Sequence, residues 1–97
     1  MDNAEIATKM TEALGKAGGT AKSVKFDFGD DGQVFASGTE ATTEDSDADC
    51  TISVTKEDFI ALAEGNLDPM MAFMSGKLKV AGDMSVAMGL QSIFSNM

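Results

Sequence analysis

The sequence has no histidine, tryptophan, tyrosine or arginine, and its single cysteine is Cys50. Without histidine, the Ser-His and Cys-His pairs that activate a nucleophile cannot form. A lone cysteine cannot form an internal disulfide, and we expect Cys50 to be a small buried apolar residue at a strand start. The acidic run 45–49 begins like a calcium-binding loop but lacks the glycine and glutamate that such a loop needs. The sequence therefore predicts a protein that is not an enzyme and holds no catalytic residue, metal or cofactor.

Positive charge is also scarce. Seven lysines stand against 16 acidic residues, which gives a formal net charge of -9 and a pI near 4.1. Nucleic-acid binding requires positive charge to displace counterions from phosphates, so we expect no nucleic acid partner. Residues 1–10 lack the basic and apolar segments of a signal peptide, and no apolar run reaches the roughly 18 residues of a membrane span. We expect a cytoplasmic protein in which residues 1–97 form one domain.

Four segments alternate apolar and polar residues as half-buried strands do, over residues 24–28, 34–37, 50–54 and 77–81. Residues 29–32 are predicted to form a hairpin turn, because Asp-Gly tolerates the positive φ of tight turns. The polar stretch 39–49 is predicted to be part strand and part loop. One set of apolar residues can share one face of the sheet: Val24, Phe26, Phe28, Ile52, Val54, Leu78 and Val80. A sheet with one wet face carries its helices on the other, which predicts an α+β fold.

Four helices are predicted from periodicity and capping residues. Residues 3–17 place apolar residues on one face at helical spacing. Thr55 begins a capping box, and Asp68 followed by Pro69 marks a further helix start. Asp83 is the predicted cap of the last helix.

The predicted last helix has an apolar surface that is wider than one core requires. Its apolar residues cover about 220° of a helical wheel, whereas packing on one core needs little more than about 100°. These residues are Met84, Val86, Ala87, Met88, Leu90, Ile93, Phe94 and Met97. The extra surface can pack in the core, meet a partner chain, lie on a membrane or line a cavity for an apolar ligand. A membrane-surface helix usually carries Lys or Arg on its polar side, and this one has neither.

Methionine is concentrated in the same region, since six of the eight methionines lie in residues 70–97. The unbranched thioether side chain adapts to irregular shapes and recurs at promiscuous apolar surfaces. This region is also poor in charge: residues 1–68 have a net charge of -10, and residues 69–97 have +1. These features favour a cavity that accepts apolar ligands of several shapes.

From Ala48 to Phe94 the sequence resembles the sterol carrier protein 2 (SCP-2) family of lipid-transfer domains. The matching positions are Ala48–Ile52, Asp58-Phe59, Leu62, Gly65, Pro69, Ala72-Phe73, Gly76–Val80, Gly82-Asp83, Ala87 and Leu90-Gln91. Their order and spacing run without a gap over about half of the chain, and the first half matches in outline as a helix followed by a hairpin. The chain departs from the peroxisomal members in lacking their terminal targeting tripeptide.

The resemblance implies a single five-stranded, largely antiparallel sheet that is covered on one face by about four or five helices, with a hydrophobic tunnel between the layers. It also implies that part of residues 39–44 is the fifth strand. Members of the family are non-enzymatic carriers, or domains appended to larger enzymes. They bind fatty acids, fatty acyl-CoA, phospholipids and sterols with little discrimination.

The sequence therefore predicts a non-specific lipid carrier, whose partner is a long-chain lipid or acyl ligand. Transient membrane contact and a monomer or weak homodimer are compatible with this function. The predicted lipid-binding residues are Phe26, Ile52, Phe59, Met70, Phe73, Met74, Val80, Met84, Met88, Gln91 and Phe94. Gln91 is the candidate for a polar contact near the tunnel mouth. The alternative is an accessory module of lipid or quinone metabolism that docks or dimerises through its charge-poor C-terminal surface.

Overall fold

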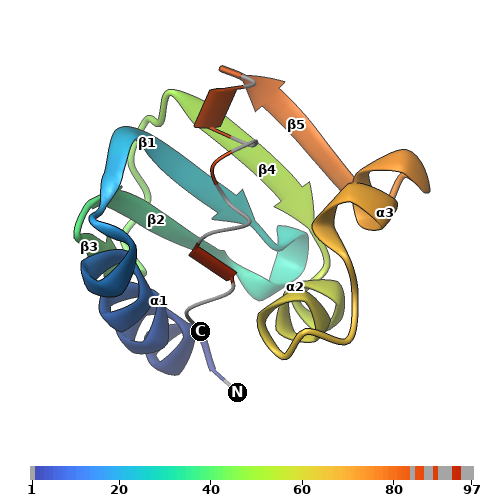
Figure 1. Cartoon of the computed structure of the whole chain (residues 1–97), viewed down its shortest axis with the longest axis horizontal. Coiled ribbons are helices and arrows are strands. Elements are labelled where there is room, and N and C mark those ends of the chain that lie inside the picture. The colour runs from blue at the N-terminus through green and yellow to red at the C-terminus, as the bar shows by residue number, and fades with distance from the viewer. Residues whose placement is uncertain (1, 84, 87–88, 90–92, 95–97) are drawn as a thin grey trace.

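A five-stranded sheet and the helices on one of its faces make up the computed structural model (Figure 1), which describes residues 2–83, 85, 86, 89, 93 and 94. The elements are α1 (Asn3–Ala17), β1 (Thr20–Asp27), the 3-10 turn η1 (Gly29–Asp31), β2 (Gln33–Gly38), β3 (Glu40–Thr42), β4 (Cys50–Val54), α2 (Lys56–Ala63), α3 (Pro69–Met74) and β5 (Leu78–Gly82). The strand order is β3-β2-β1-β4-β5. The four predicted strands and the short strand within residues 39–44 are all present.

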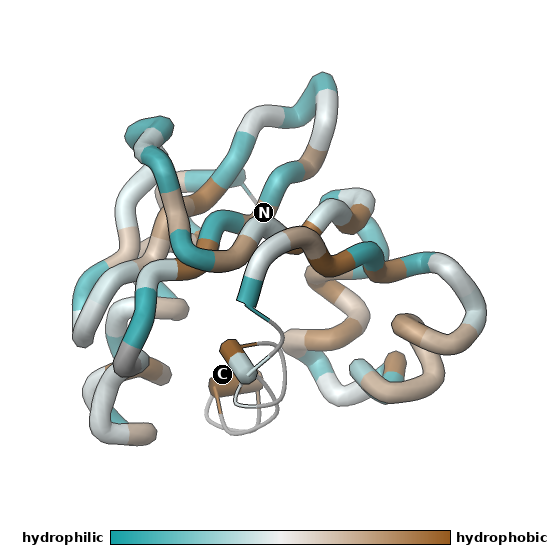
Figure 2. The backbone as a smooth tube through the Cα atoms, turned by 90° about the horizontal axis from the view of Figure 1, so that it is seen from above, coloured by the Kyte–Doolittle hydropathy of each residue, from teal (hydrophilic) through white to brown (hydrophobic). Residues whose placement is uncertain are grey.

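The sheet is largely antiparallel, as predicted. Three of the four described strand pairs are antiparallel, and the exception is the pair of β1 and β4, which is parallel. The register places Phe26 of β1 between Val34 of β2 and Ile52 of β4, and Ile52 lies opposite Val80 of β5. Figure 2 shows hydrophilic and hydrophobic residues alternating along the strands. One face is therefore apolar and buried, and the helices cover it.

Helix α1 confirms the predicted bounds at both ends. The backbone N–H of Glu5 donates to the Asp2 carboxylate at 2.8 Å, which caps the first turn. Gly18 ends the helix in the left-handed conformation, with φ 85°. Between these ends Ile6, Met10 and Leu14 are fully buried against the sheet. The apolar face of α1 thus covers part of the sheet.

The predicted caps of α2 and α3 are also present. The hydroxyl of Thr55 accepts a hydrogen bond from the backbone N–H of Asp58 at 3.1 Å. The carboxylate of Asp68 accepts one from the N–H of Met70 at 2.8 Å, with Pro69 at the first helical position. Each cap satisfies a backbone donor that the helix itself leaves unpaired.

The expected number of helices is slightly too high, although the α+β class holds. The described part contains three α-helices, η1, and helical backbone at Ser85, Val86, Gly89, Ile93 and Phe94. Among the described residues, no helix is long and apolar enough to cross a membrane.

The chain that follows β5 is attached by a small polar cluster to residues near the starts of β1 and β4. The N–H of Asp83 donates to the carbonyl of Asp49 at 3.0 Å. The carboxylate of Asp83 pairs with Lys22 and accepts hydrogen bonds from the N–H and hydroxyl of Ser85 at 2.9 and 2.6 Å. These contacts direct the C-terminal segment, here defined as the described residues from Asp83 to Phe94, back across the apolar face of the sheet (Figure 1).

Gly82 is the residue at which this reversal depends on glycine. Its φ is +102°, and a Cβ there would collide with the carbonyl oxygen of Asp49. We expect Gly82→Ala to lower the free energy of unfolding by at least about 2 kcal/mol, measured by denaturant titration.

The matched control is Gly15→Ala on the exposed side of α1, where a Cβ meets nothing within 4 Å. Glycine in a helix interior costs about 0.5–1 kcal/mol relative to alanine, so this variant should be more stable than the wild type. Equal stability of the two variants would contradict the assigned strain at Gly82.

The Lys22–Asp83 pair should make stability depend on pH. Hydrogen bonds from Lys22 and then Ser85 hold the pKa of Asp83 well below its usual range. A carboxylate whose folded pKa is lowered contributes stability above its unfolded pKa, about 3.9, and loses it as pH falls toward the folded value.

Asp83→Asn keeps a capping side chain but removes the charge. Its melting temperature should lie below that of the wild type at pH 7, and the two should converge below about pH 4. A difference that does not change between pH 7 and pH 3 would contradict this role.

Candidate functional site

Four phenylalanines meet in the layer between the sheet and the helices. Phe26 and Phe28 come from β1 and the residue after it, Phe59 from α2, and Phe94 from the C-terminal segment. Phe59 lies at the centre, with ring centroids 5.1 Å from Phe26, 5.2 Å from Phe28 and 5.5 Å from Phe94. The Phe26–Phe94 distance is 6.1 Å, and all four side chains are buried. The rings pack edge to face or tilted, which is the favourable geometry for aromatic pairs.

This aromatic cluster is part of one apolar layer. Ile52, Val24 and Val34 of the sheet are fully buried on the same face, together with Met10 of α1. Among the described residues, no polar or charged side chain is buried. A layer without polar partners can accommodate alkyl groups, and it offers no hydrogen bond for a ligand headgroup.

A hollow of about 220 Å³ lies between the start of β1 and the C-terminal segment. Its lining residues are Gly19, Thr20, Lys22, Ser85, Val86, Gly89 and Ile93. Val86 and Ile93 belong to the buried core, so the floor of this hollow is apolar and continuous with the layer that holds Phe94. A Cβ built on Gly89 would meet none of the described residues within 4 Å.

Lys22 supplies the positive charge at the rim of the 220 Å³ hollow. Its side chain is 51% exposed and forms the ion pair with Asp83 described above. The hydrogen bond and charge of Asp83 raise the pKa of Lys22, so the ammonium group is charged at neutral pH. The hollow therefore combines an apolar floor with a cation at its opening.

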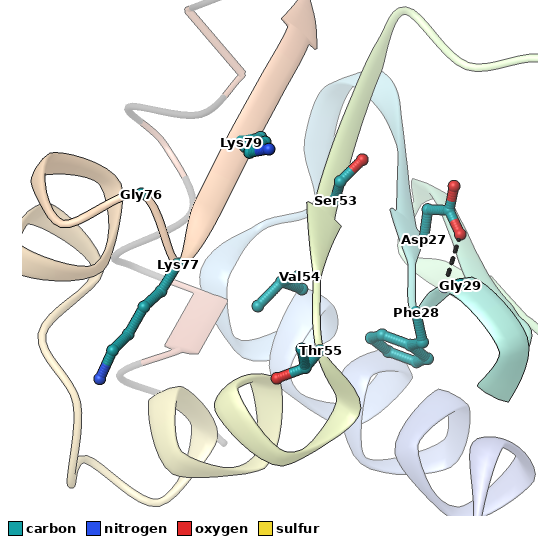
Figure 3. Close-up of a pocket in the computed structure, with 9 residues that line it drawn as sticks. All are labelled: Asp27, Phe28, Gly29, Ser53, Val54, Thr55, Gly76, Lys77 and Lys79. Carbon is teal, nitrogen blue, oxygen red and sulfur yellow. Dashed lines mark hydrogen bonds between the residues drawn. The ribbon is translucent and has the colours of Figure 1, made fainter.

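A second hollow, of about 420 Å³, lies at the other end of β1, β4 and β5 (Figure 3). Its lining residues are Asp27, Phe28, Gly29, Ser53, Val54, Thr55, Gly76, Lys77 and Lys79. Lys79 lies opposite Ser53 on the neighbouring strand, whereas the Lys77 side chain extends away from Asp27 (Figure 3). Charged side chains of both signs, from Asp27, Lys77 and Lys79, line this hollow together with the apolar side chains of Phe28 and Val54.

The predicted lipid-binding residues fall into three groups. Phe26, Ile52, Phe59 and Phe94 come together in the buried layer, and Val80 is half-buried against it. Met70, Phe73 and Met74 lie on α3 with exposed side chains. Met84, Met88 and Gln91 lie outside the described residues.

Sequence reasoning missed the residues that form the 220 Å³ hollow. Neither Gly19 nor Lys22 was assigned a role in a binding site from the sequence. Lys22 and Asp83 are 61 positions apart, so no local pattern connects them.

Two sequence predictions concern reactive groups: the role of Cys50 and the absence of a metal site. Burial raises the pKa of the Cys50 thiol, with a smaller contribution from the charge of Asp83, so the thiol is protonated and unreactive at neutral pH. Its fully buried position at the start of β4 confirms the predicted apolar role. In the described ranges, no group of three or more His, Cys, Asp or Glu side chains is arranged to hold a metal ion.

Several solved structures share this fold. The solution structure of Sterol Carrier Protein-2 from Aedes aegypti, in complex with palmitate, has a TM-score of 0.77 at 15% sequence identity and covers 96% of this chain and 94% of that one. The apo form of Sterol Carrier Protein 2 from Yarrowia lipolytica has a TM-score of 0.64 at 24% identity, covering 95% of this chain and 78% of that one. At these identities the likeness shows the fold.

The sequence is also similar to parts of much longer proteins. Sterol carrier protein 2 of Rattus norvegicus is 51% identical over 49 residues, which are 50% of this chain and 9% of the relative. Hydroxysteroid dehydrogenase-like protein 2 of Homo sapiens is 46% identical over 50 residues, or 52% of this chain and 12% of the relative. The chain thus spans about a tenth of the length of the curated relatives that it matches. A family model described as the SCP-2 sterol transfer family matches residues 6–95, and because this match extends over nearly the whole sequence, the chain belongs to that family.

Proposed function

We propose that this chain is a non-specific lipid carrier that binds fatty acids, fatty acyl-CoA or sterol-like lipids between its sheet and its helices. The observation that carries the proposal is the continuity between the aromatic cluster and the 220 Å³ hollow, whose floor is apolar and whose rim holds Lys22. Membership in the SCP-2 family supports lipid binding. The complex of the Aedes aegypti protein with palmitate supports an acyl ligand for this fold.

Alkyl burial alone can supply the affinity. Burying one methylene is worth about 0.8 kcal/mol, so a chain of sixteen carbons offers roughly 12 kcal/mol before the costs of association. Association costs at least about 4 kcal/mol. The remaining free energy corresponds to micromolar binding or somewhat tighter. Because the described residues include no buried polar side chain that could bind a headgroup, selectivity among lipids should be low.

A long chain does not fit into the hollow as it stands. The hollow holds about 220 Å³, less than the roughly 300–1,000 Å³ of typical small-molecule sites. Phe94 follows Ile93, which lines the hollow, and its ring packs against Phe26 and Phe59 of the aromatic cluster. We propose that an alkyl chain displaces Phe94 and opens the tunnel between the layers.

The lining of the bound state follows from this arrangement. Phe26, Ile52 and Phe59 form its walls, Val80 lies at the β5 edge, and Phe94 moves to admit the ligand. Met84, Met88 and Gln91 keep their predicted place in the same set, with Gln91 as a polar contact. Lys22 is the proposed partner of a carboxylate or phosphate headgroup, because it lies at the opening and its present partner, Asp83, is itself a carboxylate.

The chain itself binds lipid in this proposal and catalyses no reaction. The alternative is an accessory module of lipid or quinone metabolism that docks on an enzyme or dimerises. Light scattering distinguishes the two: a tight dimer that excludes an apolar dye supports the module, and a monomer that takes up the dye supports the carrier.

A substitution that fills the hollow should block binding. Gly89 lines the hollow, and its missing side chain leaves open space. We expect Gly89→Phe to weaken the binding of palmitate at least tenfold, measured by displacement of an environment-sensitive apolar dye.

The matched control is Gly15→Phe, which adds the same side chain to an exposed helical position of α1 that does not line the hollow. It should bind palmitate within twofold of the wild type, and circular dichroism should show both variants folded. The proposal fails if the wild type shows no saturable binding of any long-chain lipid. The assigned opening is wrong if both phenylalanine variants bind palmitate equally well.

A further inference from the structure

The large apolar side chains that are exposed in the described part of the chain all lie on one short helix. Met70, Met71, Phe73 and Met74 of α3 are 69%, 62%, 44% and 76% exposed. Monomeric proteins scatter single apolar residues over their surfaces, but a contiguous group marks an interaction site. We call these four residues the α3 patch.

The orientation of α3 is fixed by its smallest apolar residue. At about 100° per residue, the α3 patch occupies an arc of about 160°, with Ala72 on the opposite side. Ala72 is fully buried, and α3 packs beside β5 (Figure 1). The core therefore receives the alanine, while the methionines and the phenylalanine point to the outside. This arrangement is the reverse of ordinary core packing and leaves these four side chains available to an external apolar environment.

Positive charge adjoins the α3 patch. The N–H of Lys77 donates to the carbonyl of Ala72 at 2.9 Å, which holds Lys77 at the end of the helix. Lys79 follows on β5, and both lysines are exposed. Residues 69–82 contain these two lysines and no acidic residue, whereas the rest of this chain of net charge -9 is strongly acidic.

This combination fits a lipid bilayer better than a protein. A standard protein interface takes about 20–30 residues from each side, and the α3 patch has four. Interfacial membrane binding instead requires a small group of apolar side chains at the depth of the headgroups, with lysines beside the phosphates. The molecule measures 29 × 26 × 25 Å. Asp68 adjoins the patch at the start of α3, where its carboxylate accepts the N–H of Met70, and the two lysines outnumber it. Charges more than about 8 Å from the bilayer are largely screened at physiological ionic strength, so the acidic residues farther from the patch do not prevent contact.

We propose that the α3 patch, together with Lys77 and Lys79, docks this chain on a bilayer that contains anionic phospholipid. The patch inserts between headgroups, and the two lysines contact phosphate. This inference rests on the proposed function, since a carrier must contact the membrane from which it takes its lipid.

Vesicle flotation tests the docking. The vesicles contain phosphatidylcholine alone, or phosphatidylcholine with phosphatidylglycerol in a ratio of three to one. Met70→Glu/Met74→Glu should reduce the bound fraction at least tenfold on the mixed vesicles, because it places charge where apolar insertion is required. Lys77→Glu/Lys79→Glu should remove the preference for mixed over neutral vesicles.

The matched control, Ala4→Glu/Gly15→Glu, adds the same two charges to exposed positions of α1. It should float within twofold of the wild type, and thermal melts should confirm that every variant is folded. Equal flotation of the wild type and Met70→Glu/Met74→Glu would overturn the proposal. It is also overturned if sedimentation velocity shows a wild-type dimer that Met70→Glu/Met74→Glu dissociates, because the patch then binds a second copy.

Binding of palmitate by the wild type in vesicle-free buffer is measured separately. Its absence would refute the carrier function and leave the flotation result to decide whether α3 docks on membranes. Binding of palmitate without any difference in flotation would refute the docking surface alone.

Discussion

The apolar face of the sheet must be covered, and the contact of Phe59 with Phe26 is the interaction on which that cover depends. Phe26 lies in the central strand, between Val34 and Ile52, so it is the deepest point of the face. Phe59 reaches it from α2, and Phe94 contacts both rings. The aromatic cluster thus joins β1 with α2 and the C-terminal segment, whereas α1 contacts β2 and β3, and α3 contacts β5. Any ligand between the layers must use the same space.

The C-terminal segment runs back over this cluster because of polar contacts near the starts of β1 and β4. Gly82 allows the close approach to Asp49, and Asp83 fixes the direction of the following residues through Lys22 and Ser85. These contacts are exposed, and exposed ion pairs are weak individually. Their effect is one of position: they set where Val86, Ile93 and Phe94 meet the apolar face. The 220 Å³ hollow lies directly beside this attachment, because Lys22 and Ser85 both line it.

Local patterns in the sequence predicted the elements well, because caps and alternation act within a few residues. Thr55 and Asp68 cap the helices that they were predicted to cap. Long-range features could not be predicted in this way, and the pairing of Lys22 with Asp83 is an example. The orientation of α3 also could not be predicted from the sequence. A helix that is apolar on nearly every side gives no signal of which side faces the core, and burial of Ala72 decides it. The SCP-2 resemblance supplied the short strand β3, which the polar stretch 39–49 did not define.

The empty and lipid-bound states of the proposed carrier compete for the same apolar contacts. Phe94 pairs with Phe26 and with Phe59, and each aromatic pair is worth about 0.5–1.5 kcal/mol beyond its area burial. Displacing Phe94 therefore costs about 1–3 kcal/mol in ring contacts, whereas a sixteen-carbon chain offers about 8 kcal/mol after association. The cover can close over an empty layer and still yield to an alkyl chain. Neither quantity depends on the headgroup, so ligands that share a long alkyl chain should bind with similar affinity, and Lys22 can only modulate that affinity at the rim.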